Sequence, residues 1–118
     1  MWTQVTPSNK EAAGSYTSTT NTVTDSVTQM SCVIVYKNQA GTATLNTDLK
    51  VSLSADNGSN FTLTTLTATN TSAIATSHIT ATSNKVTVTA GTQLKYKVEF
   101  ANQSASKDTR IQGISLIF

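Results

Sequence analysis

A chain of 118 residues with a net charge of +2 is long enough for one compact domain and too short for two that fold independently. Its 24 threonines and 14 serines make up about a third of the residues, and because threonine is β-branched this composition favours strands over helices. The eight basic residues are spread thinly and no apolar run approaches the length of a membrane span, which argues against a nucleic-acid partner and against a transmembrane helix.

The N-terminal quarter of the chain has few apolar anchors. Residues 15–22 are almost entirely Ser, Thr and Asn, and we expect residues 1–27 to form an N-terminal arm or an edge strand. Residues 28–118 are expected to form a β-sandwich domain. The first strand of that domain, 28–37, has apolar side chains on both faces, which is typical of a central strand covered on both sides.

Strict alternation of apolar and polar residues predicts two further strands. The apolar positions begin at Leu49 in 48–55 and at Leu94 in 93–101. A turn is expected at Gly91-Thr92, before the second of these strands, and a bulge at Thr64-Thr65, where the apolar residues change phase. The remaining expected strands are 42–45, the stretch from Phe61, 73–82, 85–90 and 110–118.

The spacing of these segments sets the fold class. About eight short strands, separated by turns at roughly ten-residue intervals, are typical of sandwiches and barrels. No stretch shows sustained helical periodicity. We therefore predict an all-β fold, an antiparallel two-sheet β-sandwich of about eight strands with jelly-roll topology.

The stretch SADNGSNF, from Ser54 to Phe61, resembles the S-x-D-x-G-x-T-W Asp-box hairpin of sialidases. Sialidase chemistry also needs an arginine cluster and a Tyr/Glu nucleophile pair, whereas this chain has one such box and only Arg110. What remains is geometry: an Asn-Gly pair, here Asn57-Gly58, between two alternating runs is a strong hairpin signal.

No catalytic constellation stands out. His78 lies within a strand alternation, Cys32 has apolar neighbours, and Glu99 alternates with Lys95 and Lys97 on the wet face of its strand. Each is better explained as an ordinary strand residue than as a catalytic base, nucleophile or acid. The other carboxylates sit at turns or strand starts, without the spacing of a calcium loop. We expect no enzymatic activity, no cofactor and no metal.

Three stretches, SCVIVYKNQAGTATLNTDLKVSLSADNGSNF, VTAGTQLKYKVEFANQ and KDTRIQGISLIF, together resemble a β-rich module of environmental phage and virus virion proteins, especially tail fibres and similar appendages. Phe61 and Phe100 stand where that module would be expected to carry Trp. The resemblance implies a structural domain at the virion surface, in contact with other virion proteins, and a homo-oligomer with a trimer as the favoured assembly.

From the resemblance we expect a tail-fibre or appendage domain that serves in host attachment, with capsid decoration and a carbohydrate-binding module as alternatives. A tail-fibre domain would attach to a host-surface glycan or protein through loops 38–41, 56–60 and 102–109. A capsid decoration (cement) protein would clamp neighbouring capsomers with its N-terminal arm and one sheet face. A non-catalytic carbohydrate-binding module would need an exposed aromatic platform, yet the aromatic residues are mostly in phase with the core. The candidate receptor or subunit contacts are Asp56, Asn57, Ser59, Asn60, Asn38 and Gln39.

Overall fold

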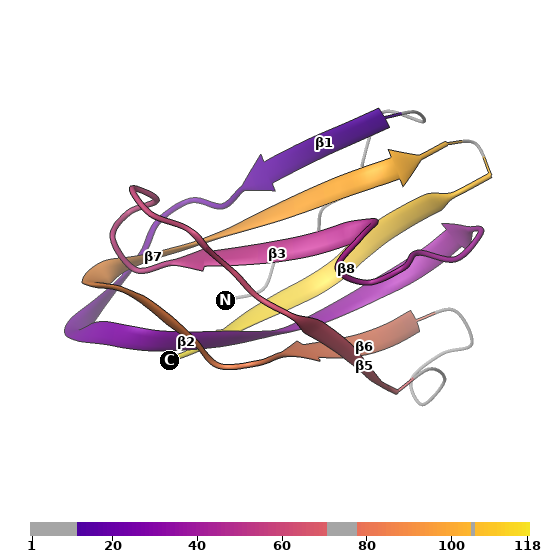
Figure 1. Ribbon diagram of the computed structural model, residues 1–118. Coiled ribbons are helices and arrows are strands. Elements are labelled where there is room, and N and C mark those ends of the chain that lie inside the picture. The colour runs from indigo at the N-terminus through magenta and orange to yellow at the C-terminus, as the bar shows by residue number, and fades with distance from the viewer. Residues whose placement is uncertain (1–11, 71–77, 105) are drawn as a thin grey trace.

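The computed structural model describes residues 12–70, 78–104 and 106–118 (Figure 1). In these ranges the chain forms β1 (Ala12–Thr17), β2 (Asn21–Ala40), β3 (Leu49–Ser54), β4 (Thr62–Leu63), β5 (Leu66–Asn70), β6 (His78–Ser83), β7 (Val86–Gln103) and β8 (Asp108–Ile117). All strand pairs are antiparallel. The prediction of an all-β, antiparallel fold with about eight strands is confirmed. The described residues include no helix of the length and apolarity that crossing a membrane requires.

Two long strands organise the sheet. The N-terminal halves of β2 and β7 pair with each other, and the strands then diverge. Beyond that point β7 pairs with β3 and β1, and β3 with β4, a group that we call the β7 half. β2 pairs with β6 and β8, and β6 with β5, a group that we call the β2 half.

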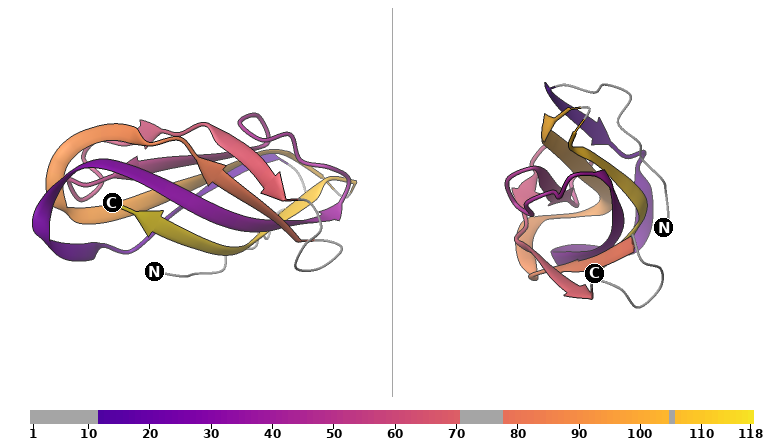
Figure 2. Two further views of the ribbon diagram at one scale, coloured as in Figure 1. Left: turned by 90° about the horizontal axis from the view of Figure 1, so that it is seen from below. Right: turned by 90° about the vertical axis from the view of Figure 1, so that its right-hand side faces the viewer.

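The sheet curls so that its two halves face each other (Figure 2). The alternation predicted for the strands supplies the core, because the apolar residues of β3 and of the C-terminal half of β7 are buried. Together with those of β2, β6 and β8 they form one hydrophobic cluster. Hydrogen bonds join the strands into a single curled sheet in the order β4-β3-β7-β2-β6-β5, so a sandwich of two separate sheets with jelly-roll topology is not confirmed.

The turn predicted at Gly91-Thr92 is wrong, because β7 runs through these residues without a break. The glycine has a different cause: a Cβ atom at Gly91 would collide with the carbonyl oxygen of Ala55. The ladder between β2 and β7 also shifts its register beside Gly91. Gly91 therefore allows a close backbone approach within a strand rather than a reversal of the chain.

The bulge predicted at Thr64-Thr65 is also wrong. The chain leaves β4 in the β7 half and enters β5 in the β2 half at this point, and the crossing accounts for the change of apolar phase. Thr64 anchors the crossing, since its backbone N–H (2.9 Å) and its hydroxyl (2.8 Å) both donate to the carbonyl oxygen of Val51. In place of the strand expected at 42–45 there is one isolated bridge, between Leu45 and Leu49.

At the N-terminal side, β1 pairs with β7 at the edge of the β7 half. Residues 21–27 belong to β2, so the sheet begins before residue 28. Residues 1–11 of the expected arm, and residues 73–77 of the strand expected at 73–82, lie outside the described residues.

Candidate functional site

The six predicted contact residues lie at opposite ends of the sheet. Four of them, Asp56, Asn57, Ser59 and Asn60, follow the end of β3. The other two, Asn38 and Gln39, are among the last residues of β2. Figure 1 shows these two strand ends on opposite sides of the molecule, β3 ending at the left and β2 at the right. The structure therefore gives two separate candidate surfaces.

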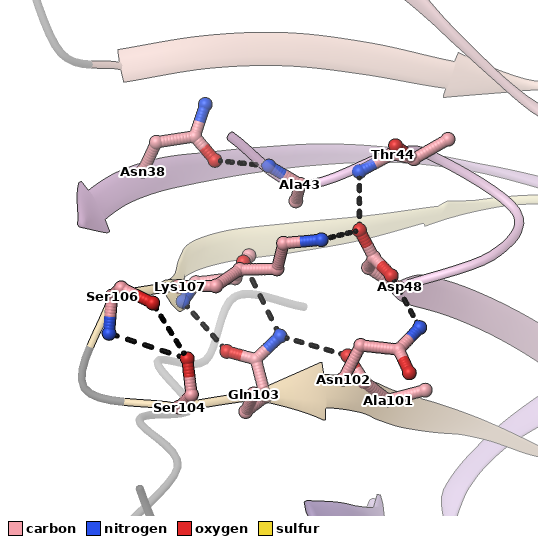
Figure 3. A network of polar contacts seen from close by, with 11 residues as sticks. Asn38, Ala43, Thr44, Asp48, Ala101, Asn102, Gln103, Ser104, Ser106 and Lys107 are labelled. Atoms are coloured by element: carbon pink, nitrogen blue, oxygen red, sulfur yellow. Dashed lines mark hydrogen bonds and ion pairs between the residues drawn. The ribbon is translucent and has the colours of Figure 1, made fainter. Parts of the chain in front are cut away.

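A carboxylate that the sequence did not single out organises the end at which β2 finishes (Figure 3). Asp48 is only 2% exposed, and it accepts hydrogen bonds from Asn102 Nδ2 (2.7 Å), the Thr44 N–H (2.8 Å) and Lys107 Nζ (2.9 Å). The hydrogen bond from Asn102, followed by those from Thr44 and Lys107, lowers the pKa of Asp48 to about 2. The group is ionised and fully engaged, so it ties three chain segments together rather than binding a ligand.

The remaining polar contacts at this end are of the same structural kind. Asn38 Oδ1 accepts a hydrogen bond from the Ala43 N–H at 3.0 Å, which closes the turn after β2. Gln103 Oε1 accepts from the Thr109 N–H at 2.8 Å and so joins the end of β7 to the start of β8. Of the two contact residues predicted at this end, Asn38 thus stabilises a turn, and Gln39 is the exposed one.

The other surface is the segment from Ser54 to Phe61, which we call the 54–61 loop. Asp56 accepts hydrogen bonds from Ser54 Oγ (2.7 Å), the Asn60 N–H (2.9 Å) and Asn60 Nδ2 (2.7 Å). The Ser54 hydroxyl, and then the two Asn60 donors, lower the pKa of Asp56 to about 2. Asn57 and Gly58 both have positive φ angles, 60° and 82°, which matches the hairpin predicted from the Asn-Gly pair, and β3 and β4 pair on either side.

The loop is also tied to its neighbours. The Asn57 N–H donates to the Gln93 carbonyl at 2.9 Å, and the Gln93 N–H donates to the Ala55 carbonyl at 3.1 Å. Thr20 Oγ1 donates to Asn57 Oδ1 at 2.6 Å, which orients the Asn57 amide. The side chains of Asn57, Ser59 and Asn60 are exposed, so a fixed backbone presents two amides and a hydroxyl to solvent.

The aromatic residue of the loop is not a free platform. The Lys97 Nζ atom stands over the Phe61 ring, 4.8 Å from its centroid. The Phe61 ring and the Lys95 stem also lie close to Gly58, because a Cβ atom added there would be 3.4 Å from Phe61 Cε2 and 3.3 Å from Lys95 Cδ. The ring thus positions a lysine ammonium beside the loop.

Cys32 and His78, which the sequence raised as possible catalytic residues, both lie within strands. Cys32 is 1% exposed, and burial raises the pKa of its thiol to about 11. His78 begins β6, and its Nδ1 atom has no hydrogen-bond partner among the described residues. Within residues 12–70, 78–104 and 106–118, no group of three or more His, Cys, Asp or Glu side chains is placed to hold a metal ion. The absence of enzymatic activity stays a prediction.

No family model and no curated protein matches this chain. A solved structure, the C-terminal domain of EclA, a sugar-binding protein, is similar to it with a TM-score of 0.51 and 21% sequence identity. The match covers 99% of this chain and 77% of the EclA chain. At this level of identity the likeness shows a shared fold.

Proposed function

We propose that the chain is a non-catalytic sugar-binding domain that contacts its saccharide through the 54–61 loop. The fold it shares with the EclA domain supports this proposal, because that domain belongs to a sugar-binding protein. The observation that carries it is the loop itself: Asp56 fixes the backbone from inside, while Asn57, Ser59 and Asn60 are exposed at the tip.

A fixed loop suits saccharide recognition for a physical reason. Sugars are bound largely through hydroxyl groups, and amide and hydroxyl side chains can both donate to and accept from a hydroxyl. A loop already held in one conformation loses little entropy when it binds, so more of the interaction energy appears as affinity. Asp56 then acts as a positioning residue, and the exposed side chains make the contacts.

The setting that we propose is the outer surface of a virion, where such a domain would serve in host attachment as part of a tail fibre or appendage. The sequence resemblance supports this setting, and capsid decoration is the alternative role within it. A homo-oligomer, with a trimer favoured, fits the exposed apolar residues at the end of β8, since Ile117 is 50% and Phe118 62% exposed. They line a groove of about 540 Å³ together with Val23 and Val27.

A glycan array followed by affinity measurement on the best ligand tests the sugar-binding proposal. The double variant Asn57→Gly with Ser59→Ala removes two exposed side chains, and glycine keeps the positive φ that position 57 requires. We expect at least a tenfold loss of affinity, with a fall of only a few degrees in melting temperature because the exposed hydrogen bond from Thr20 is also lost. Thr42→Ala, which removes an exposed hydroxyl just after β2 at the opposite end of the sheet, is the matched control and should bind normally.

Two results would count against the proposal. An array that stays blank at high protein concentration would show that the domain does not bind sugars. Full binding by the loop variant would place the site elsewhere. Independently, light scattering that finds a monomer would argue against the fibre setting.

A further inference from the structure

A row of charged side chains runs along the outer face of the β7 half. Lys95, Lys97 and Glu99 alternate with core residues of β7, so they point away from the core. In the ladder between β3 and β7, Lys50 lies opposite Glu99, and Ser54 lies opposite Lys95. Because Ser54 holds the 54–61 loop, the loop lies over this same face.

The charges on the face are unevenly compensated. Glu99 lies opposite Lys50 and two residues from Lys97 on β7, so its single charge is shared between them and lies farther from Lys95. The ion pairs among the described residues are Lys107–Asp48 and Arg110–Asp108, and neither includes Lys95 or Lys97. Two residues apart on one strand, the Cα atoms of these lysines are about 7 Å apart, so an anion between the two ammonium groups would relieve their mutual repulsion.

Both lysines are held beside the exposed tip of the loop. The Lys97 ammonium stands over the Phe61 ring, and the Lys95 stem lies near Gly58, where an added Cβ atom would be 3.3 Å from Lys95 Cδ. Because Lys97 covers a face of Phe61, a neutral sugar gains less there than it would on a bare aromatic ring. The one acidic residue of the loop, Asp56, accepts three hydrogen bonds from Ser54 and Asn60, so its oxygens are directed into the loop.

The same face continues into a hollow beyond Glu99. A hollow of about 350 Å³ is lined by Gly14, Ser15, Lys50, Glu99, Phe100 and Ala101. Ser15 of β1 and Lys50 of β3 both lie opposite Glu99, so the hollow opens on the outer face of β7. From Lys95 to Ala101, β7 extends about 20 Å, which is long enough for a saccharide of several units.

We propose that the saccharide bound by this domain is anionic, with a carboxylate or sulfate group held between Lys97 and Lys95 and its chain running along β7 toward the hollow beside Gly14. This inference rests on the proposed sugar-binding function and names its substrate class. The 54–61 loop supplies hydrogen bonds to hydroxyls, and the two lysines select for the negative charge.

The test compares oligosaccharides of similar length in three arms, sulfated, carboxylated and neutral, by calorimetry at low and at moderate salt. Anionic ligands should bind at least tenfold more tightly than neutral ones, and only their binding should weaken as salt is added. Lys97→Gln should reduce the affinity for the anionic ligand at least tenfold, and Lys97→Arg should restore most of it. Lys37→Gln removes the same charge from β2, in the other half of the sheet, and should bind as the wild type does.

The possible outcomes separate this inference from the proposed function. Binding of neutral sugars alone would overturn the anionic substrate class and keep the sugar-binding function, whereas no binding in any arm would overturn both. Equal losses in Lys97→Gln and Lys37→Gln would remove Lys97 from the site. Equally tight binding of a DNA duplex would indicate attraction to any polyanion and would contradict a saccharide site. The sulfated and carboxylated arms identify which anionic group is preferred.

Discussion

Replacing Asp48 by asparagine tests whether this buried carboxylate holds the end of the molecule together. The substitution keeps the shape of the side chain but turns one acceptor oxygen into a donor. An NH₂ group on the side of Asn102 would face the Asn102 amide nitrogen, and an NH₂ group on the other side would face both the Thr44 N–H and Lys107. In either orientation the new NH₂ group is buried and faces a donor, so at least one hydrogen bond to position 48 is lost.

The size of the effect follows from these contacts. A hydrogen bond to a charged group contributes roughly 1.5–3 kcal/mol, so losing one and weakening two gives about 3 kcal/mol. The Lys107 side chain is 31% exposed and can turn to water, which places its share at the low end. For a chain of this length, 3 kcal/mol corresponds to a fall of about 12 °C in melting temperature.

Urea unfolding followed by fluorescence measures the loss directly as a lower midpoint at constant slope. Asp108→Asn is the matched control, since it breaks a more exposed ion pair, with Arg110, and should cost no more than about 1 kcal/mol. If the two variants differ by less than about 0.5 kcal/mol, the assignment of Asp48 as the organising residue of this end is wrong.

Three further outcomes are expected. Hydrogen bonds hold the pKa of Asp48 at about 2, against an ordinary value of 3.8. The ionised group therefore contributes its full stability above pH 3.8, and this contribution is lost as pH falls toward 2. Melting temperatures measured from pH 6 to pH 2 should fall less in Asp48→Asn than in the wild type. Gly91→Ala should lower the free energy of unfolding in urea by about 2 kcal/mol, because the new Cβ atom meets the Ala55 carbonyl. Gly14→Ala has open space around the new Cβ atom and should change it by less than about 0.5 kcal/mol. Equal effects of the two substitutions would contradict the close approach at Gly91. Cys32 should react with a thiol reagent only after unfolding, because burial raises its pKa to about 11, and rapid labelling of the native protein would show that the thiol is accessible.

The strands were predictable because the burial of one face of a strand produces an alternation of apolar and polar residues within a few consecutive positions. The pattern beginning at Leu49 predicted β3, and the pattern beginning at Leu94 predicted the C-terminal half of β7. The failures occurred where one local signal has two physical causes. A glycine such as Gly91 can mark a turn or a close approach, and a change of phase such as that at Thr64 can mark a bulge or a crossing between the two halves.

The candidate site was predictable only in part, for a related reason. The 54–61 loop has its signal within eight consecutive residues, and the structure shows the expected hairpin. Asp48 looked like an ordinary aspartate near a strand start, because its partners Asn102 and Lys107 are 54 and 59 residues away in the chain. The lysine row was visible as alternation along β7, but its position beside the loop depends on the pairing of β3 with β7, which the sequence did not specify.

An aspartate organises each end of the molecule, and burial decides what each end can do. Asp48 accepts hydrogen bonds from nearby Thr44 and from Asn102 and Lys107, which are distant in the chain, and it is 2% exposed, so its role is to stabilise this end. The donors on Asp56 all come from its own loop, which leaves exposed polar side chains at the tip and Lys97 beside it. Stability and binding should therefore respond to different substitutions. Asp48→Asn should lower the melting temperature without changing the glycan affinity of the folded protein. Lys97→Gln should lower the glycan affinity without changing the melting temperature.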